Sequence, residues 1–258
     1  MFDLHNHLIP GIDDGAPDLD TALSLARIAV ADGITHMVCT PHIHAGRYDN
    51  TADTIAPAFA RLRAALADQR LPLRISHAAE VRITPDLLNP AYTDALPALG
   101  SWDGRPVLLL ELPHGQVPVG TDKLTQFLLR KGVVPIIAHP ERNKGFIARP
   151  ERLKTLIDQG CLLQLTAGAL TGRFGPNAQA LAETLLCDGV ATLIATDAHN
   201  LKSRIPRLQE GVDAAAALIG DAAATALVVE RPQRLAAIHF DQPRPGMLSI
   251  GAARALAA

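Results

Sequence analysis

The sequence predicts an α/β fold in which repeated βα units close into a barrel. Short apolar runs alternate with helical patterns along most of the chain, which is typical of such units. The length of 258 residues is that of many α/β barrels that form one domain. Most of the apolar runs also end in histidine or carboxylate side chains, as barrel strands do where they open on an active site.

Seven apolar runs are predicted to be the strands. They cover residues 2–6, 34–40, 73–80, 106–112, 133–138, 161–166 and 191–196. A first helix is predicted at Leu19–Ala31, because apolar residues recur at helical spacing between Asp18, a suitable N-cap, and Gly33. Further amphipathic helices are predicted at 53–68, 122–131, 150–159, 177–189 and 221–228.

The C-terminal stretch is harder to assign. Residues 241–258 contain Pro243 and Pro245 and then a short apolar segment, which fits either a packed cap or a loose tail. The sequence contains no internal linker or low-complexity segment, so we expect a single domain over residues 1–258.

Composition excludes several classes of function. Hydrophobic residues make up 48% of the chain but aromatic residues only 3%, so the core is expected to be aliphatic. The net charge of −2 shows no basic stripe for nucleic acid or a membrane surface. Three distant cysteines argue against a disulfide framework, and we find neither a signal peptide nor a membrane-spanning run. We therefore expect a soluble cytoplasmic protein.

The ends of the predicted strands carry the chemistry. Six of the seven end in side chains that bind metals, and the remaining one ends in Thr166. The carboxyl ends of barrel strands open on one face, so these side chains should converge there. The six endings are His5-Asn6-His7, Thr40-Pro41-His42, Glu80, Glu111, His139 and Asp197-Ala198-His199.

Each of these residues also has a structural explanation. His5 and His7 alternate along a strand and so point to the same side, but a lone His-x-His is as often two loop histidines. Glu80 and Glu111 need a partner if buried, and Arg82 or Arg105 could pair with either of them. The repetition of the pattern favours a metal centre.

Nitrogen and oxygen donors without thiolates suit Mn²⁺, Fe²⁺ or Zn²⁺. The nine candidate ligands exceed the needs of one ion, so two or three ions are expected, with a carboxylate bridging them. Clustered divalent ions suit hydrolytic phosphoryl transfer, because they hold phosphate oxygens, lower the pKa of a water and neutralise developing charge. The candidate ligands are His5, His7, Asp14, His42, Glu80, Glu111, His139, Asp197 and His199.

Two arginines follow ligand-bearing strands. Arg142 and Arg204 lie three and five residues beyond histidine ligands, where each can reach back and bind phosphate, although either alone resembles an ordinary surface arginine. His44 and His114 lie on neighbouring loops and are weaker candidates for substrate contact. The glycine-rich segment 166–175 lacks the ending of a P-loop and is predicted to be a substrate-side loop. The remaining histidines are predicted to be structural or on the surface: His36, His77 and His239.

Four motifs resemble those of one known superfamily. They are DLHNHLIPGIDDG at 3–15, CTPHIHAGRY at 39–48, AHPERN at 138–143 and ATDAHN at 195–200. Together they resemble the polymerase and histidinol phosphatase (PHP) superfamily. The DDG element and the segment TAGALTGRFG point to one branch of it, the bacterial manganese-dependent protein-tyrosine phosphatases of capsular and exopolysaccharide loci. The similarity runs from residue 2 to about residue 235.

This resemblance implies a distorted (β/α)7 barrel with three ions, Mn²⁺ in the family. One ion would be held by His5, His7, Glu80 and Asp197. Glu80 would bridge to a second ion, shared with Glu111 and His139. The third would be held by Asp14, His42 and His199. Asp13 competes with Asp14 for that role, because the spacing from His7 does not distinguish them. The family's phosphate-binding arginines would be Arg142 and Arg204, and Thr196 replaces its usual serine.

The implied substrate is the phosphotyrosine tail of a bacterial tyrosine autokinase that regulates polysaccharide synthesis and export. Two alternative enzymes remain, namely a phosphatase for a small ester such as histidinol phosphate and a barrel amidohydrolase. The amidohydrolase is disfavoured because no lysine ends a predicted strand. A metal-binding regulatory module without catalysis is the third alternative, and the intact ligand set argues against it.

Overall fold

The computed structural model describes residues 1–241 and 248–256. Its strands are β1 (Phe2–Asp3), β2 (His36–Cys39), β3 (His42–Ile43), β4 (Arg74–His77), β5 (Glu80–Arg82), β6 (Gly100–Trp102), β7 (Arg105–Glu111), β8 (Val134–Ala138), β9 (Leu162–Thr166) and β10 (Leu193–Ala195). Its α-helices are α1 (Leu19–Ala31), α2 (Ala52–Asp68), α3 (Pro90–Ala95), α4 (Thr121–Arg130), α5 (Lys144–Ala148), α6 (Pro150–Gln159), α7 (Ala167–Leu170), α8 (Pro176–Cys187), α9 (Gln209–Ile219), α10 (Asp221–Ala226), α11 (Glu230–Phe240) and α12 (Ile250–Leu256). Two 3-10 turns are η1 (Pro85–Leu88) and η2 (Pro140–Arg142).

The strands form a distorted barrel of seven positions, as predicted. One parallel sheet has the order β1-β2-β4, and a second runs β10-β9-β8-β7-β5-β3. The two sheets are continuous where the chain passes from β2 to β3 and from β4 to β5, because Ala78 N donates to Cys39 O and Glu80 N to Pro41 O. The parallel bridge between Asn6 and Ala198 brings the first strand beside the last. The ring is therefore complete.

The predicted strands correspond to this ring, with three differences. Residues 73–80 were expected to form one strand, but Ala78 and Ala79 separate β4 from β5. β3 and β6 were not predicted, because each is only two or three residues long. β6 is an antiparallel hairpin partner of β7, outside the ring.

The predicted helices are confirmed with ends that agree within two residues. Asp18 caps α1 by accepting a hydrogen bond from Thr21 N, and Gly33 follows with a φ of 87° that favours glycine. The helices α3, α5, α7, α9 and α11 were not predicted. No helix among residues 1–241 and 248–256 is both long and apolar enough to cross a membrane.

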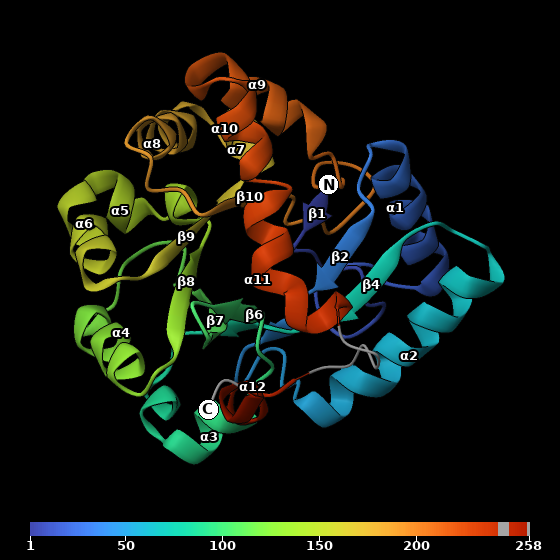
Figure 1. Ribbon diagram of the computed structural model, residues 1–258, viewed down its shortest axis with the longest axis horizontal. Helices are drawn as coiled ribbons and strands as arrows, with labels where there is room; N and C mark the ends of the chain where they lie inside the picture. Colours follow the sequence, from blue (N-terminus) through green and yellow to red (C-terminus); the bar gives the residue numbers. More distant parts are fainter. Residues whose placement is uncertain (242–247, 257–258) are drawn as a thin grey trace.

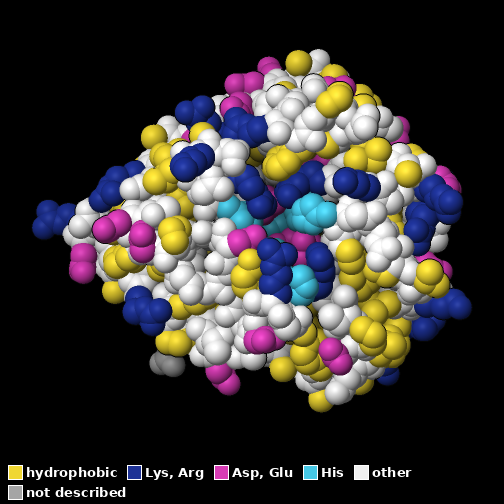
Figure 2. Space-filling model, turned by 180° about the vertical axis from the view of Figure 1, so that it is seen from behind, with side chains coloured by type: hydrophobic (Ala, Val, Ile, Leu, Met, Phe, Trp, Pro, Cys, Tyr) yellow, Lys and Arg dark blue, Asp and Glu magenta, His cyan; other side chains and the backbone are white. Residues whose placement is uncertain are grey.

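Helices surround the barrel, and α11 lies across one of its openings (Figure 1). Inward residues of the strands, such as Leu109, Ile136 and Leu193, pack with Leu235 and Phe240 of α11 into a separate apolar core. A larger core fills the layer between the strands and the outer helices. One end of the barrel is thus closed by α11, and polar side chains gather on the opposite face (Figure 2).

The described part of the C-terminal stretch is packed. Ile250 of α12 is fully buried, and its backbone N–H donates to Leu96 O, while Ala98 N donates to Leu248 O. Of the two alternatives for this stretch, a packed cap or a loose tail, residues 248–256 therefore fit the packed cap. Residues 242–247 and 257–258, on which the same alternatives bear, lie outside the described part of the chain.

Candidate metal centre

A polar cavity of about 240 Å³ opens on the face opposite α11. Figure 2 shows this cavity as a hollow rimmed by lysine or arginine and histidine side chains, with acidic groups inside. Five of the candidate ligands line it: Asp14, His42, Glu80, Glu111 and His139. Both candidate phosphate-binding arginines and both weaker loop histidines also line it, so the structure brings together residues from across the whole chain.

All nine candidate ligands lie in four overlapping groups. Within each group, one donor atom from every residue is within 4.8 Å of the others. The groups are His7 with Asp14, His42 and His199; His5 with His7 and Glu80; His5 with His139 and Asp197; and His42 with Glu80 and Glu111. These groups overlap with the three sites that the family resemblance implies, although none coincides with one of them.

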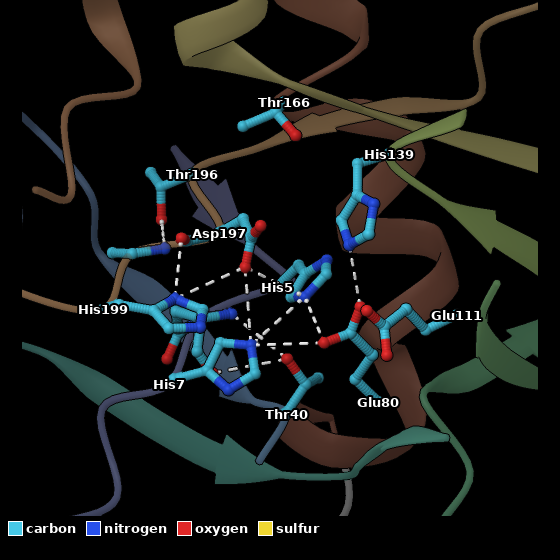
Figure 3. A network of polar contacts seen from close by, with 12 residues as sticks. His5, His7, Thr40, Glu80, Glu111, His139, Thr166, Thr196, Asp197 and His199 are labelled. Atoms are coloured by element: carbon cyan, nitrogen blue, oxygen red, sulfur yellow. Dashed lines mark hydrogen bonds and ion pairs between the residues drawn. The ribbon is translucent and has the colours of Figure 1, made fainter. Parts of the chain in front are cut away.

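The centre of the cluster is built from the first, third and last strand positions. The Nε2 atom of His5 lies 3.2 Å from Glu80 Oε2 and 3.3 Å from Asp197 Oδ1. The Nε2 atom of His7 lies 3.3 and 3.4 Å from the same two oxygens. Figure 3 shows these two imidazoles and two carboxylates pointing toward one another. On the far side of Glu80, His139 Nε2 lies 2.9 Å from Oε1.

Outer hydrogen bonds fix which ring nitrogen faces the cluster. His5 Nδ1 donates to Gln164 Oε1 over 2.7 Å, and His7 Nδ1 donates to Asp13 Oδ2 over 2.7 Å. His199 Nδ1 donates to the carbonyl of Asp197. These partners leave the Nε2 lone pairs free for a cation, which is the usual arrangement around metal-binding histidines.

This geometry separates the two adjacent aspartates. Asp13 is buried and accepts from His7, Gly15 N and His42 N, so its oxygens face away from the cluster. Asp14 Oδ1 instead lies 3.3 Å from His42 Nε2 and 3.5 Å from His199 Nε2. Asp14 is therefore the member of the pair that faces the cluster, and Asp13 orients a histidine.

His42 is held in a different way from the other rings. Its Nδ1 lies 3.0 Å from Glu80 and its Nε2 lies beside Asp14, so both nitrogens face carboxylates. The ring of Tyr48 stacks on it at 5.4 Å between centroids, with 6° between the planes. Asn50 Nδ2 donates to the His42 carbonyl. Stacking and backbone contacts thus position this ring.

Unpartnered buried atoms show that the cluster suits cations. His42 Nδ1, Glu80 Oε2, Glu111 Oε2 and Asp197 Oδ1 are buried, and within the described residues none of them has a hydrogen-bond partner. Buried polar atoms are nearly always paired, and an unpaired carboxylate is especially costly. All four atoms belong to the groups above, so the residues present fit divalent ions.

The electrostatics of the centre are those of a cation site. Burial alone would lower the pKa of His5, but the carboxylates of Glu80 and Asp197 outweigh it and raise this pKa. Burial, then the neighbouring charge of Glu80, raises the pKa of Glu111 to about 7. Burial lowers the pKa of His139 to about 3, with Arg142 adding to the effect. The carboxylates and imidazoles of the centre therefore shift one another's pKa values, as is common among the closely packed ionisable groups of functional sites.

Glu111 contacts Arg82, one of the two arginines that the sequence suggested, and also lies beside a histidine of the cluster. Its Oε2 forms an ion pair with Arg82 Nη1 over 2.9 Å, without the geometry of a hydrogen bond, and lies 3.8 Å from His42 Nδ1. The pair with Arg82 is the structural explanation. Arg82 also donates to the carbonyl of Leu112. The ion pair thus coexists with membership of the cluster.

Arg142 and Arg204 both form ion pairs with Asp197 Oδ2. The other oxygen of Asp197 faces His5 and His7, so this carboxylate lies between the cluster and the arginines. The guanidinium of Arg142 also lies 4.2 Å from the centre of the Phe174 ring. The predicted substrate-side loop 166–175 therefore reaches the arginine.

Two of the candidate ligands have strained backbones. The φ angles are 34° at His139 and 50° at Asp197, both in the left-handed region that non-glycine residues rarely adopt. Asp197 N donates to His5 O, and the adjacent Thr196 donates through its backbone N–H and its Oγ1 to the buried Asp3. Such strain persists only where the surroundings hold it, and it is common at functional sites.

Sequence reasoning missed the positioning residues. Asp3 and Gln164 are buried polar residues within otherwise apolar strands, and that interruption was the available signal. Arg47 and Tyr48, which line the cavity, gave no signal beyond following a ligand by a few residues. Cys39 is fully buried, and burial raises the pKa of its thiol, so it is not a thiolate nucleophile.

The other histidines are confirmed as structural or peripheral. His239 is buried and accepts from Ser76 while donating to the carbonyl of Leu99. His77 is buried against the ring of Phe59, at 4.1 Å between centroids. His36 stacks on Phe2 at 4.2 Å. These three contacts lie outside the cluster.

Comparisons with known proteins agree on one group. Residues 1–237 match the family model described as "Capsular polysaccharide synthesis, CpsB/CapC". The chain is 34% identical to the tyrosine-protein phosphatase YwqE of Bacillus subtilis over 212 residues, which is 82% of each chain.

Solved structures give the same picture. The fold matches, with a TM-score of 0.84 and 32% identity, a crystal structure from work on YwqE of Bacillus subtilis and CpsB of Streptococcus pneumoniae, described there as unique metal-dependent tyrosine phosphatases. That match covers 91% of this chain and 94% of the other. An organophosphorus hydrolase from Deinococcus radiodurans matches at a TM-score of 0.55 and 18% identity over 91% and 92% of the two chains, which shows a shared fold alone.

Proposed function

The chain belongs to the CpsB/CapC family, and from this premise we propose that it is a metal-dependent protein-tyrosine phosphatase. The observation that carries the proposal is the set of unpartnered carboxylate and imidazole atoms in the cluster, bordered by two arginines. The carboxylate and imidazole atoms suit divalent cations, and the adjacent arginines suit a phosphate group.

The nine candidate ligands would hold two or three divalent ions. The central position would take His5, His7, Glu80 and Asp197, whose donor atoms approach within 3.4 Å across the group. Glu80 would bridge to His139 and Glu111, and Asp14 would join His42 and His199. Bound divalent ions supply Lewis-acid charge and an activated water for phosphoester hydrolysis. Mn²⁺ is our first choice, with Fe²⁺ or Zn²⁺ as alternatives.

The arginines act on the substrate. Arg142 and Arg204 share Asp197 Oδ2, so both guanidinium groups already lie at the edge of the cluster. A phosphate there would accept hydrogen bonds from both, and the charge that develops during transfer would be stabilised by groups that are already oriented. A phenolate is a good leaving group, which favours tyrosine phosphate over serine phosphate.

Relatives named tyrosine-protein phosphatases support this reading over a small-ester phosphatase, an amidohydrolase or a regulatory module. The family description concerns capsular polysaccharide synthesis. We infer that the substrate is the phosphotyrosine tail of a bacterial tyrosine autokinase that regulates polysaccharide synthesis and export. The phosphatase would act on this tail in the cytoplasm.

The test compares matched phosphotyrosine and phosphoserine peptides. Protein purified without chelators is assayed, then stripped with EDTA and refilled separately with Mn²⁺, Fe²⁺ or Zn²⁺. We expect hydrolysis only in the refilled samples and faster hydrolysis of phosphotyrosine. Equal rates on the two peptides contradict the tyrosine specificity, and full activity in excess EDTA contradicts the metal dependence.

A further inference from the structure

A second surface cavity, of about 460 Å³, lies between η1 and α4. Its lining is mainly apolar, as the yellow side chains at the lower right of the space-filling face indicate (Figure 2). We call it the η1–α4 groove, and its principal apolar lining residues are Ile83, Pro85, Leu88, Val119, Leu124 and Phe127.

The groove continues from the metal centre along two segments. Arg82 lines the polar cavity, and the next residue, Ile83, lines the groove while its N–H donates to the Glu111 carbonyl. His114 lines the polar cavity, and the same loop reaches the groove at Pro118. The 114–118 loop and the Arg82–Ile83 step thus form a wall between the two cavities. A substrate peptide that leaves the polar cavity across this wall enters the groove.

That wall is fixed in place. Asn143 Nδ2 donates to the carbonyls of Pro113 and Gln116, at 2.8 and 3.2 Å, and Lys144 N donates to the His114 carbonyl. The His114 loop is therefore attached to the segment that carries His139 and Arg142. A ligand in the groove would therefore be held at a fixed distance from His139 and Arg142.

The groove exposes apolar side chains to water. Val119 is fully exposed at 102%, and Leu88 is 50% exposed. They are two of five large hydrophobic residues that are exposed in the described part of the chain. A pair of exposed apolar residues beside a cavity is typical of a binding surface.

The charges of the groove favour an acidic ligand. Its lining includes Lys123 and Arg130 and no acidic residue among those described. Arg130 donates to the Gln126 amide, and neither cation forms an ion pair with a carboxylate of residues 1–241 or 248–256. The exposed Arg47 adds positive charge at the rim of the polar cavity.

We propose that the η1–α4 groove binds the polypeptide next to the phosphotyrosine, which rests on the proposed function. An apolar side chain of the substrate packs on Leu88, Val119 and Phe127, and an acidic side chain pairs with Lys123 or Arg130. The four steps along the chain from His114 to Pro118 span at most about 14 Å, so the apolar residue lies roughly two to four positions from the phosphotyrosine.

The test uses Val119→Asp with three substrates. These are p-nitrophenyl phosphate, a phosphotyrosine peptide with leucine and glutamate two to four residues on both sides, and the same peptide with serine at those positions. Wild type should show a KM roughly tenfold lower for the leucine peptide, the scale of one apolar side chain losing its burial. Val119→Asp should remove this preference and leave p-nitrophenyl phosphate kinetics unchanged.

A matched control is Leu218→Asp on α9, which replaces another exposed hydrophobic residue outside the groove and should behave as wild type. Light scattering on a size-exclusion column shows whether Val119→Asp alters the oligomeric state, and such a change would assign the groove to a second copy and overturn the proposal. Wild type that cleaves p-nitrophenyl phosphate but does not distinguish the peptides also overturns it. If wild type cleaves none of the three substrates, the result contradicts the proposed function rather than the groove.

Discussion

The two ends of the barrel interior differ in how completely their buried polar side chains are hydrogen-bonded. At the closed end, His239 of α11 is buried and both ring nitrogens have partners, Ser76 and the Leu99 carbonyl. At the open end, Glu80 and Asp197 are as deeply buried, yet each keeps an oxygen with no hydrogen-bond partner in the described part of the chain. These side chains are equally buried, but only His239 has all of its polar atoms hydrogen-bonded within the residues that the structure describes.

Among the described residues, buried atoms without a partner also occur outside the cluster, at both ring nitrogens of His77 for example, so the open end is marked by their concentration on candidate ligands. The His239 contacts are complete within the protein, so nothing further is needed there. The open end carries strained φ angles at His139 and Asp197 as well as its unpaired oxygens. Backbone strain and unpaired buried oxygens both cost free energy, and proteins tolerate them where a bound ligand or a reaction offsets that cost.

The largest expected effect follows from Glu80→Gln. Glu80 lies within 3.3 Å of His5, His7, His42 and His139, so its loss removes the group shared by most of the cluster. We expect kcat/KM to fall at least about a thousandfold, as when one member of a catalytic unit is removed. Metal content per chain, measured by mass spectrometry, should fall with it. Ser76→Ala at the closed end is the control and should keep the metal content of wild type.

The arginines come next. Arg142→Ala or Arg204→Ala should lower kcat/KM roughly ten- to a thousandfold, the scale for one preorganised charge-stabilising group. Metal content should persist, because neither guanidinium belongs to the donor groups. Arg→Lys at either position keeps the charge but loses the planar fork, and should recover only part of the rate. Wild-type kinetics in the alanine variants would remove both residues from phosphate binding.

The adjacent aspartates sharpen the comparison further. Asp14→Asn should lower the number of ions per chain, because Asp14 lies beside His42 and His199. Asp13→Asn should keep that number and weaken metal affinity about ten- to a hundredfold, since it loses only the orientation of His7. Calorimetric metal titration measures both quantities, and identical titrations for the two variants would contradict the separate roles.

The smallest expected effect concerns the closed end. Burial lowers the pKa of His239 to about 4, below the usual value of 6.5, so the folded state keeps this ring neutral. Its contribution to stability is complete above about pH 6.5 and is lost as the pH falls toward 4, because only the unfolded chain takes up the proton there. The linkage amounts to about 2 kcal/mol at pH 5.

Urea unfolding of the metal-free protein at pH 7 and pH 5 measures this. His239→Gln should be less stable than wild type at pH 7 but lose less stability on acidification, since His77, whose pKa burial also lowers to about 4, is present in both proteins. Parallel declines in the two proteins would show that His239 carries no such linkage.

Sequence patterns predicted the ring and the clustering of the candidate ligands because both repeat. Each strand position is an apolar run followed by a polar donor, and seven repeats make the pattern hard to miss. β6, α9 and α11 have no such repetition, and α11 in particular carries charged and apolar residues whose partners lie in distant strands. The positioning contacts were also hidden, because pairs such as His5 with Gln164 are 159 residues apart. Only the folded barrel shows which of Asp13 and Asp14 faces inward.

The seam between the first and last strands has a consequence for synthesis of the protein. Asp3 and Thr196 are joined across 193 positions, and the same seam brings His5 and His7 beside Asp197. Contacts so distant form late in folding, after their long loop has closed. On the ribosome, the amino-terminal histidines must wait for β10 to emerge before the centre is complete. A chain that ends before β10 therefore lacks Asp197 and cannot form the complete centre.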